Sequence, residues 1–144
     1  MMQNLDPYSY RCGVIDCFNE MVAAGVKSLA LSHPVDTQEE LDALVSYAHE
    51  SCRRYHTKLY PECAPLVTDL FPAGLNRGKY NILFYQADHV IEEYIRLKER
   101  KAGMMESGAY FGGNRSRLAW DYGRLLSYPE ETIRRLIQEN TGKE

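Results

Sequence analysis

The strongest pattern in this chain is an amphipathic stretch that runs over residues 37–59. Its apolar side chains recur at the i, i+3, i+4, i+7 spacing of one helix face: Leu41, Leu44, Val45, Ala48, Cys52, Tyr55 and Leu59. Asp36 or Thr37 supplies the side chain that caps the first turn. Pro61 and Pro65 end the pattern, because proline interrupts a helix. The stretch therefore predicts a helix of about five turns.

Weaker signals on either side predict the other elements of the first half. Asp6 followed by Pro7 predicts a helix start, since aspartate caps well and proline is favoured at the first helical position. Gly25 is expected to end that helix. Apolar-centred runs between turn residues predict three strands, at residues 26–32, 66–71 and 80–85.

Three further helices are expected in the second half. One begins at Asp88, with Glu92 and Arg96 paired four residues apart on its surface. Another begins near Asn114. The last begins at Ser127, which with Glu130 matches the capping-box pattern.

These elements predict an α+β fold in one domain, residues 1–144, since no repeat or flexible linker divides the chain. The first two strands flank the long helix, which favours a parallel right-handed crossover. The second and third strands are close enough in sequence for an antiparallel hairpin. We therefore expect a small mixed sheet of about three strands, packed by four to five helices.

Composition limits the function. An apolar fraction of 44% with a net charge of −3 excludes general disorder, and no run of about 18 apolar residues could span a membrane. Asp and Glu outnumber Lys and Arg by 20 to 17, which disfavours a general nucleic-acid binder. Residues 1–6 are polar and lead into a helix, so we expect no export signal, a cytoplasmic location and reduced cysteines.

We expect the cysteines and histidines to hold no metal, and no cofactor motif is present. His49 and His56 are about 10.5 Å apart along a helix, too far for both to ligate one zinc ion. Cys52, His56 and Cys63 remain a geometrically allowed set. Cys52 also falls on the apolar stripe, where a free cysteine behaves as a small hydrophobe.

Three segments carry a resemblance to known proteins: 24–32 (AGVKSLALS), 68–71 (TDLF) and 123–129 (GRLLSYP). Together they resemble an uncharacterised, largely archaeal family of prokaryotic proteins of unknown function. Some members carry cysteines just after the Tyr-Pro pair, where this chain has Glu130 and Glu131, so no thiol chemistry carries over. The resemblance implies membership of the family and no mechanism.

The loop at residues 32–37 gives a first candidate site. Ligands of parallel α/β units usually bind at the carboxyl ends of strands, and Asp69 falls near the end of the neighbouring expected strand. His33 and Asp69 would then be a catalytic pair, a general base and its orienting carboxylate. The alternative is a turn histidine and an aspartate that satisfies loop amides.

A second candidate is the segment 108–117 (GAYFGGNRSR). Gly112 and Gly113 allow unusual backbone conformations, and Asn114 can cap the next helix. Free N–H groups at such a helix start attract anions, and Arg115 and Arg117 would add charge-assisted contacts. The alternative is a connecting loop with solvated arginines.

Trp120 is expected on the polar face of its helix, near Arg124. It is either a cation–π partner or part of a contact surface, unless another helix of the same domain covers it. Two functions stay open. One is binding of a small anionic, phosphate-like molecule at residues 112–117, with histidine acid–base chemistry if the protein is an enzyme. The other is a non-enzymatic protein that forms a homodimer or binds a partner through Trp120 and Arg124.

Overall fold

The first two helices start at the caps that the sequence predicts. In the computed structural model, which describes residues 3–144, the Asp6 side chain accepts a hydrogen bond from the Ser9 amide at the start of α1 (Pro7–Ala23). Thr37 caps α2 (Gln38–Tyr55) in the same way. α2 ends one turn early, because His56 adopts the left-handed conformation with φ of 58°. The first two residues of the segment 1–6 lie outside the described residues.

The sheet has three strands, as expected, but its pairing is antiparallel throughout. Its strands are β1 (Leu29–Leu31), β2 (Lys58–Glu62) and β3 (Asn81–Tyr85), in the order β1-β3-β2. β1 and β2 both run antiparallel to β3 and so point the same way, with α2 between them in the chain. The crossover therefore joins strands that are not neighbours, and no parallel pair forms in the described sheet.

The prediction of a strand at residues 66–71 is wrong, because this segment is a buried loop. The strand β2 lies earlier in the chain, where it overlaps the end of the helix predicted at residues 37–59. Side chains, not a neighbouring strand, satisfy the loop's backbone. The Tyr94 hydroxyl accepts from the Leu66 amide at 3.0 Å, and Asn140 donates to the Asp69 carbonyl at 2.9 Å. β2 is an edge strand, where Pro61 is tolerated because an edge residue need not donate to the ladder.

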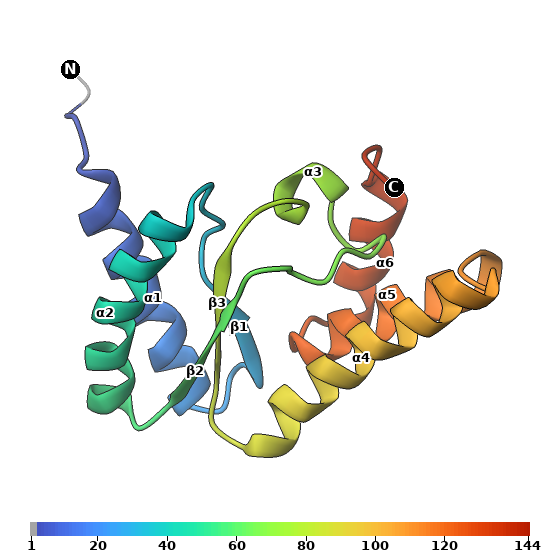
Figure 1. Cartoon of the computed structure of the whole chain (residues 1–144). Helices are drawn as coiled ribbons and strands as arrows, with labels where there is room; N and C mark the ends of the chain where they lie inside the picture. Colours follow the sequence, from blue (N-terminus) through green and yellow to red (C-terminus); the bar gives the residue numbers. More distant parts are fainter. Residues whose placement is uncertain (1–2) are drawn as a thin grey trace.

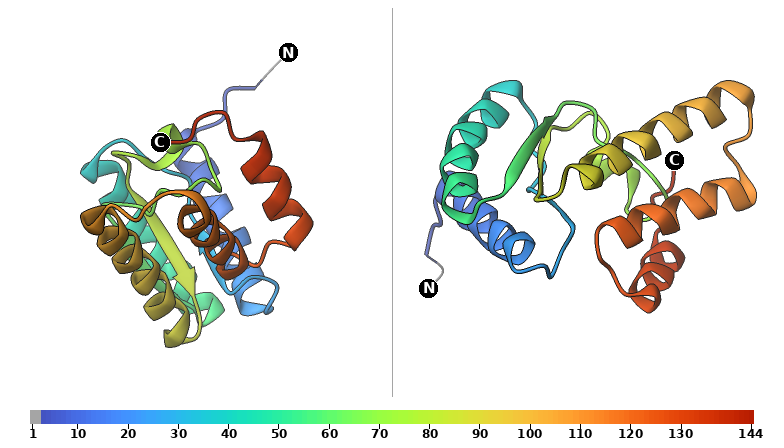
Figure 2. Two further views of the ribbon diagram at one scale, coloured as in Figure 1. Left: turned by 90° about the vertical axis from the view of Figure 1, so that its right-hand side faces the viewer. Right: turned by 90° about the horizontal axis from the view of Figure 1, so that it is seen from below.

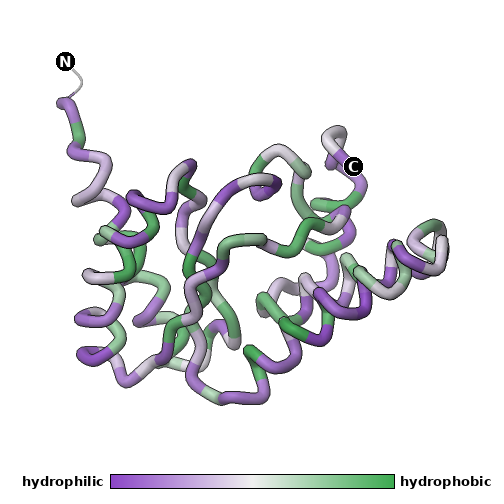
Figure 3. The backbone as a smooth tube through the Cα atoms, in the orientation of Figure 1, coloured by the Kyte–Doolittle hydropathy of each residue, from purple (hydrophilic) through white to green (hydrophobic). Residues whose placement is uncertain are grey.

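Helices cover both faces of the sheet, which explains why β3 is an uninterrupted apolar run (Figure 1). Ile82 and Phe84 pack against α1 and α2, whereas Leu83 and Tyr85 face the opposite layer. Figure 2 shows the two helical layers separated by the sheet. Figure 3 shows hydrophobic stretches in the sheet between them and hydrophilic stretches along the helices.

The second half forms the far layer. It contains α3 (Ala73–Asn76), α4 (Asp88–Ser107), α5 (Gly112–Leu125) and α6 (Glu130–Glu139). Two predicted caps are wrong. Phe111 precedes α5, so Asn114 lies inside its first turn. Ser127 lies before α6 with φ of 66°, and its hydroxyl accepts from the Ser28 amide at 2.9 Å.

α4 buries Val90, Ile91, Tyr94 and Leu97 on one face. No helix within residues 3–144 is long and apolar enough to cross a membrane.

Candidate functional site: an arginine-lined groove between α4 and α5

A hollow of about 500 Å³ lies between α4 and α5. These helices form an antiparallel hairpin, and Gly108 ends α4 in the left-handed conformation that lets the chain turn back. Buried apolar side chains of both helices form the floor: Val90, Leu97 and Leu125. The other lining residues are polar: Ser28, His89, Glu93, Arg96, Arg100, Asp121 and Arg124.

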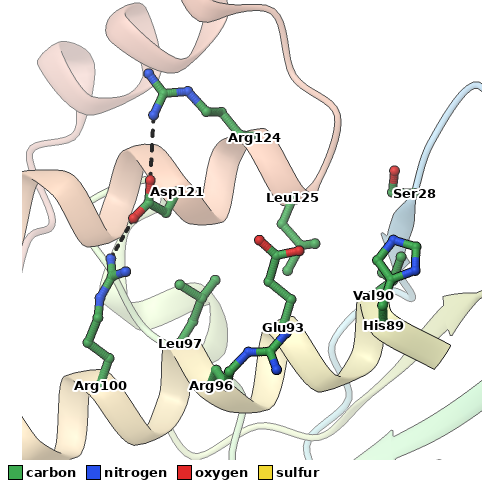
Figure 4. A pocket seen from close by; sticks show the side chains of 10 residues that line it. All are labelled: Ser28, His89, Val90, Glu93, Arg96, Leu97, Arg100, Asp121, Arg124 and Leu125. Atoms are coloured by element: carbon green, nitrogen blue, oxygen red, sulfur yellow. Dashed lines mark hydrogen bonds and ion pairs between the residues drawn. The ribbon is translucent and has the colours of Figure 1, made fainter. Parts of the chain in front are cut away.

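Asp121 on α5 joins two of the three arginines (Figure 4). Its carboxylate accepts from Arg100 of α4 at 2.7 Å, and the other oxygen lies 3.5 Å from Arg124. Arg124 also pairs with Glu130 at 3.0 Å. All of these groups are partly solvent-exposed, so each pair contributes little to stability. Their arrangement places two guanidinium groups beside one carboxylate.

Arg96 is the arginine of the groove that makes no ion pair in the described chain. The ion pairs of the described chain do not include the expected pair of Arg96 with Glu92, nor any pair of the neighbouring Glu93. Three arginines against two carboxylates give the lining residues a formal charge of +1 with His89 neutral. Glu130, the partner of Arg124, lies outside this lining, and Arg117 adds a further positive charge where the groove continues. The lining is therefore locally basic in an acidic protein.

A second hollow of about 190 Å³ continues the groove toward the turn of the hairpin. It shares Arg100 and Asp121 with the first and adds Asn114 and Arg117. Arg117 is exposed and donates to the Asn114 side-chain oxygen at 2.7 Å. The arginine row thus extends along both helices.

The opposite end of the groove is fixed by contacts between the segment before β1 and the turn before α6. Lys27 donates to the Leu126 carbonyl at 2.6 Å, and its ammonium lies 4.7 Å from the centre of the Tyr128 ring. Burial lowers the pKa of Lys27. Ser28 and His89 also line a third hollow, of about 180 Å³, which adjoins this end.

The structure separates the residues that the sequence grouped at 112–117. Asn114 and Arg117 line the groove, whereas Gly112 and Gly113 line none of the hollows described above. Arg115 turns away and binds both carboxylate oxygens of Asp69, each at 2.8 Å. This hydrogen bonding to Asp69 raises the pKa of Arg115. Arg115 is therefore committed to an ion pair and does not face the groove.

The structure does not bring His33 and Asp69 together as a catalytic pair. Both oxygens of Asp69 are occupied by Arg115, and no hydrogen bond or ion pair links His33 to Asp69 in residues 3–144. Asp69 is buried because it anchors the loop between β2 and α3, a structural role for which its sequence position gives no signal.

Trp120 is half-buried rather than free on a polar face. Its ring packs against the core of the α4–α6 layer, and Arg124 and Arg134 lie 5.3 Å and 5.9 Å from the ring centre. α6 therefore covers part of the ring. A contact surface formed by Trp120 and Arg124 stays a prediction.

All four cysteines are free: Cys12 and Cys52 are buried, and Cys17 and Cys63 are exposed. Burial is the main reason that the pKa of the Cys52 thiol is raised. In the described part of the chain no three His, Cys, Asp or Glu side chains lie together as a metal site would require.

The candidate residues predicted from the sequence include Arg117 and Arg124 of this groove. They do not include Arg100, His89 or Arg96. A signal for two of these exists, since Arg96 and Arg100 are four residues apart and share a helix face. Comparison of the chain with models of protein families, with curated proteins and with solved structures finds no match, so the resemblance to an archaeal family stays a prediction.

Proposed function

We propose that the protein binds a small anionic, phosphate-like molecule in the groove between α4 and α5. The observation that carries this proposal is Arg96, a guanidinium that makes no ion pair in the described chain and lies at the rim of a hollow of about 500 Å³. Arg100 and Arg124 lie in the same hollow and share Asp121. Guanidinium groups bind phosphate through paired N–H groups, which favours such a ligand over a neutral one.

The apolar floor favours a ligand that has a non-polar part. Val90, Leu97 and Leu125 lie beneath the charged rim, and ligand sites commonly combine an apolar lining with a few polar groups. An organic phosphate would place its phosphate at Arg96 and its organic group over this floor. Inorganic phosphate would use only the rim.

If the protein is an enzyme, the histidine in position for acid–base chemistry in this groove is His89 rather than His33. It is seven residues from Arg96, about 10.5 Å of helix rise, and so would contact a different part of the ligand. The proposal itself concerns binding.

The test is a calorimetric titration with phenyl phosphate, and phenol serves as the neutral probe. We expect Arg96→Gln to weaken phenyl phosphate binding about tenfold or more, the usual range for one charge-assisted contact. Arg53→Gln is the matched control, because Arg53 is an exposed arginine of α2 outside the groove. Equal affinities of the wild type and Arg96→Gln, or equal binding of phenol, would refute the proposal.

A further inference from the structure

A fourth hollow, with a different chemistry, lies on the other side of α4, and the side chain of Glu144 is held there as a bound ligand would be. Arg77 donates to one carboxylate oxygen at 2.7 Å, and Lys101 donates to the other. Arg115 donates to the main-chain oxygen of Glu144 at 2.8 Å. The three cations come from three parts of the chain, so the fold assembles this site.

Two of the cations are positioned without help from Glu144. Lys101 also donates to the Val67 carbonyl at 2.7 Å, and Arg115 is held by Asp69. Both lie on the Tyr110 ring, 5.2 Å and 5.1 Å from its centre. The Tyr110 hydroxyl is buried here with no hydrogen-bond partner in the described chain. The site would therefore keep its shape if Glu144 left it, which lowers the cost of binding another carboxylate.

Glu144 lines the charged end of this hollow, whose volume is about 280 Å³, together with Arg77, Lys101 and Lys98, and Lys98 is paired with Glu62. The rest of the wall is largely apolar and is formed by Pro65, Leu66, Val67, Ala102 and Met105. Met105, at the end of this wall, has 58% of its surface exposed. A carboxylate alone leaves this wall uncovered.

We propose that this hollow binds a small carboxylic acid with an apolar body, and that Glu144 competes with that acid for Arg77 and Lys101. The acid's carboxylate takes the place of the Glu144 side chain, and its apolar group covers the wall that ends at Met105. Glu144 is only four residues from Asn140, which is buried and bound to the Asp69 carbonyl. A group tethered so closely competes at a high effective concentration.

This competition makes the test specific. Hexanoate is the probe, and hexanamide is its neutral counterpart of nearly the same shape. Glu144→Gln removes the competing charge, so we expect it to bind hexanoate at least fivefold more tightly than the wild type does in an NMR titration. Glu139→Gln is the matched control, since Glu139 is exposed at the end of α6 and should leave the affinity unchanged.

Two further variants test the two ends of the hollow. Adding Arg77→Gln to Glu144→Gln should reverse the gain, because Arg77 is mostly exposed and its side chain has no other ion pair in residues 3–144. Met105→Glu should weaken hexanoate binding and leave phenyl phosphate binding unchanged, whereas Arg96→Gln should leave hexanoate binding unchanged. If Glu144→Gln lowers stability without a gain in hexanoate affinity, or gains equally for hexanamide, Glu144 is only a structural anchor and the proposal is wrong.

Discussion

Replacing Gly123 by alanine should destabilise the protein, although alanine is the better helix former. Gly123 is buried where α5 crosses α6, and a Cβ built on it would lie 2.7 Å from Cγ1 and 2.9 Å from Cδ1 of Ile133. Ile133 is fully buried and β-branched, so its side chain has little freedom to rotate away. The two helices must therefore move apart, or the core around Ile133 must rearrange.

The size of the effect follows from two opposing contributions. Overpacking a core by one methyl group costs about 1–3 kcal/mol, whereas alanine gains about 1 kcal/mol over glycine in a helix interior. Because the added Cβ would lie less than 3.0 Å from two Ile133 atoms, the upper part of the overpacking range, about 2–3 kcal/mol, applies. We therefore expect Gly123→Ala to lower the free energy of unfolding by about 1–2 kcal/mol. Gly103→Ala on α4 is the control, because nothing lies within 4 Å of its added Cβ. That variant should be more stable than the wild type by about 0.5–1 kcal/mol.

Urea denaturation and differential scanning calorimetry would measure the difference. A chain of 144 residues has an unfolding entropy of about 0.3 kcal/mol/K, so each kcal/mol shifts Tm by about 3 °C. The two glycine variants should differ in Tm by about 5–9 °C. Ile133→Ala should cost less stability in the Gly123→Ala background than in the wild type, since it removes the clashing atoms. A Gly123→Ala protein that is stabilised as much as Gly103→Ala would refute the close contact between α5 and α6.

Two other substitutions test the polar groups that hold the loop before α3. Tyr94→Phe should lower the free energy of unfolding by about 1–3 kcal/mol, because it leaves the buried Leu66 amide without an acceptor; Tyr10→Phe, on an exposed tyrosine, should change it little in the same urea titration. Burial favours the neutral form of Glu144, but hydrogen bonds from Lys101 and Arg77 outweigh it and lower the pKa. Its ionised form therefore stabilises the fold above the unfolded pKa of about 4.3, and this contribution is lost as pH falls through the lower folded value. The difference in unfolding free energy between wild type and Glu144→Gln should thus shrink below about pH 4, and a constant difference would contradict the ion pairs.

Local sequence signals predicted the elements whose stability is local. The caps at Asp6 and Thr37 and the apolar stripe of α2 act within a few residues, and the apolar run of β3 is long enough to need two covered faces. The three-strand α+β fold followed from these. The strand order could not be predicted in this way. The position of β3 between β1 and β2 depends on pairing between strands and not on local residues.

The wrong predictions concern segments whose backbone groups form hydrogen bonds with side chains far away in the sequence. The segment 66–71 has the apolar residues of a strand, but its amide and carbonyl groups bond to Tyr94, Lys101 and Asn140, which follow it by 28 to 71 residues. Ser127 has the sequence of a cap, but its hydroxyl accepts from Ser28, 99 residues earlier. Such long-range partners leave no trace in local composition or periodicity.

The net charge of the chain also says little about the groove, because charge acts locally. At physiological ionic strength exposed charges are screened beyond about 8 Å, so a bound anion is affected mainly by the side chains that surround it. α4 carries Arg96 and Arg100 one turn apart, and α5 carries Arg117 and Arg124 two turns apart, so each pair shares a face of its helix. The hairpin turn at Gly108 brings these faces to the same groove, with Asp121 between them. A chain of charge −3 can therefore present a basic site to a small anion, and the spacing of the arginines, rather than their number, is what makes it one.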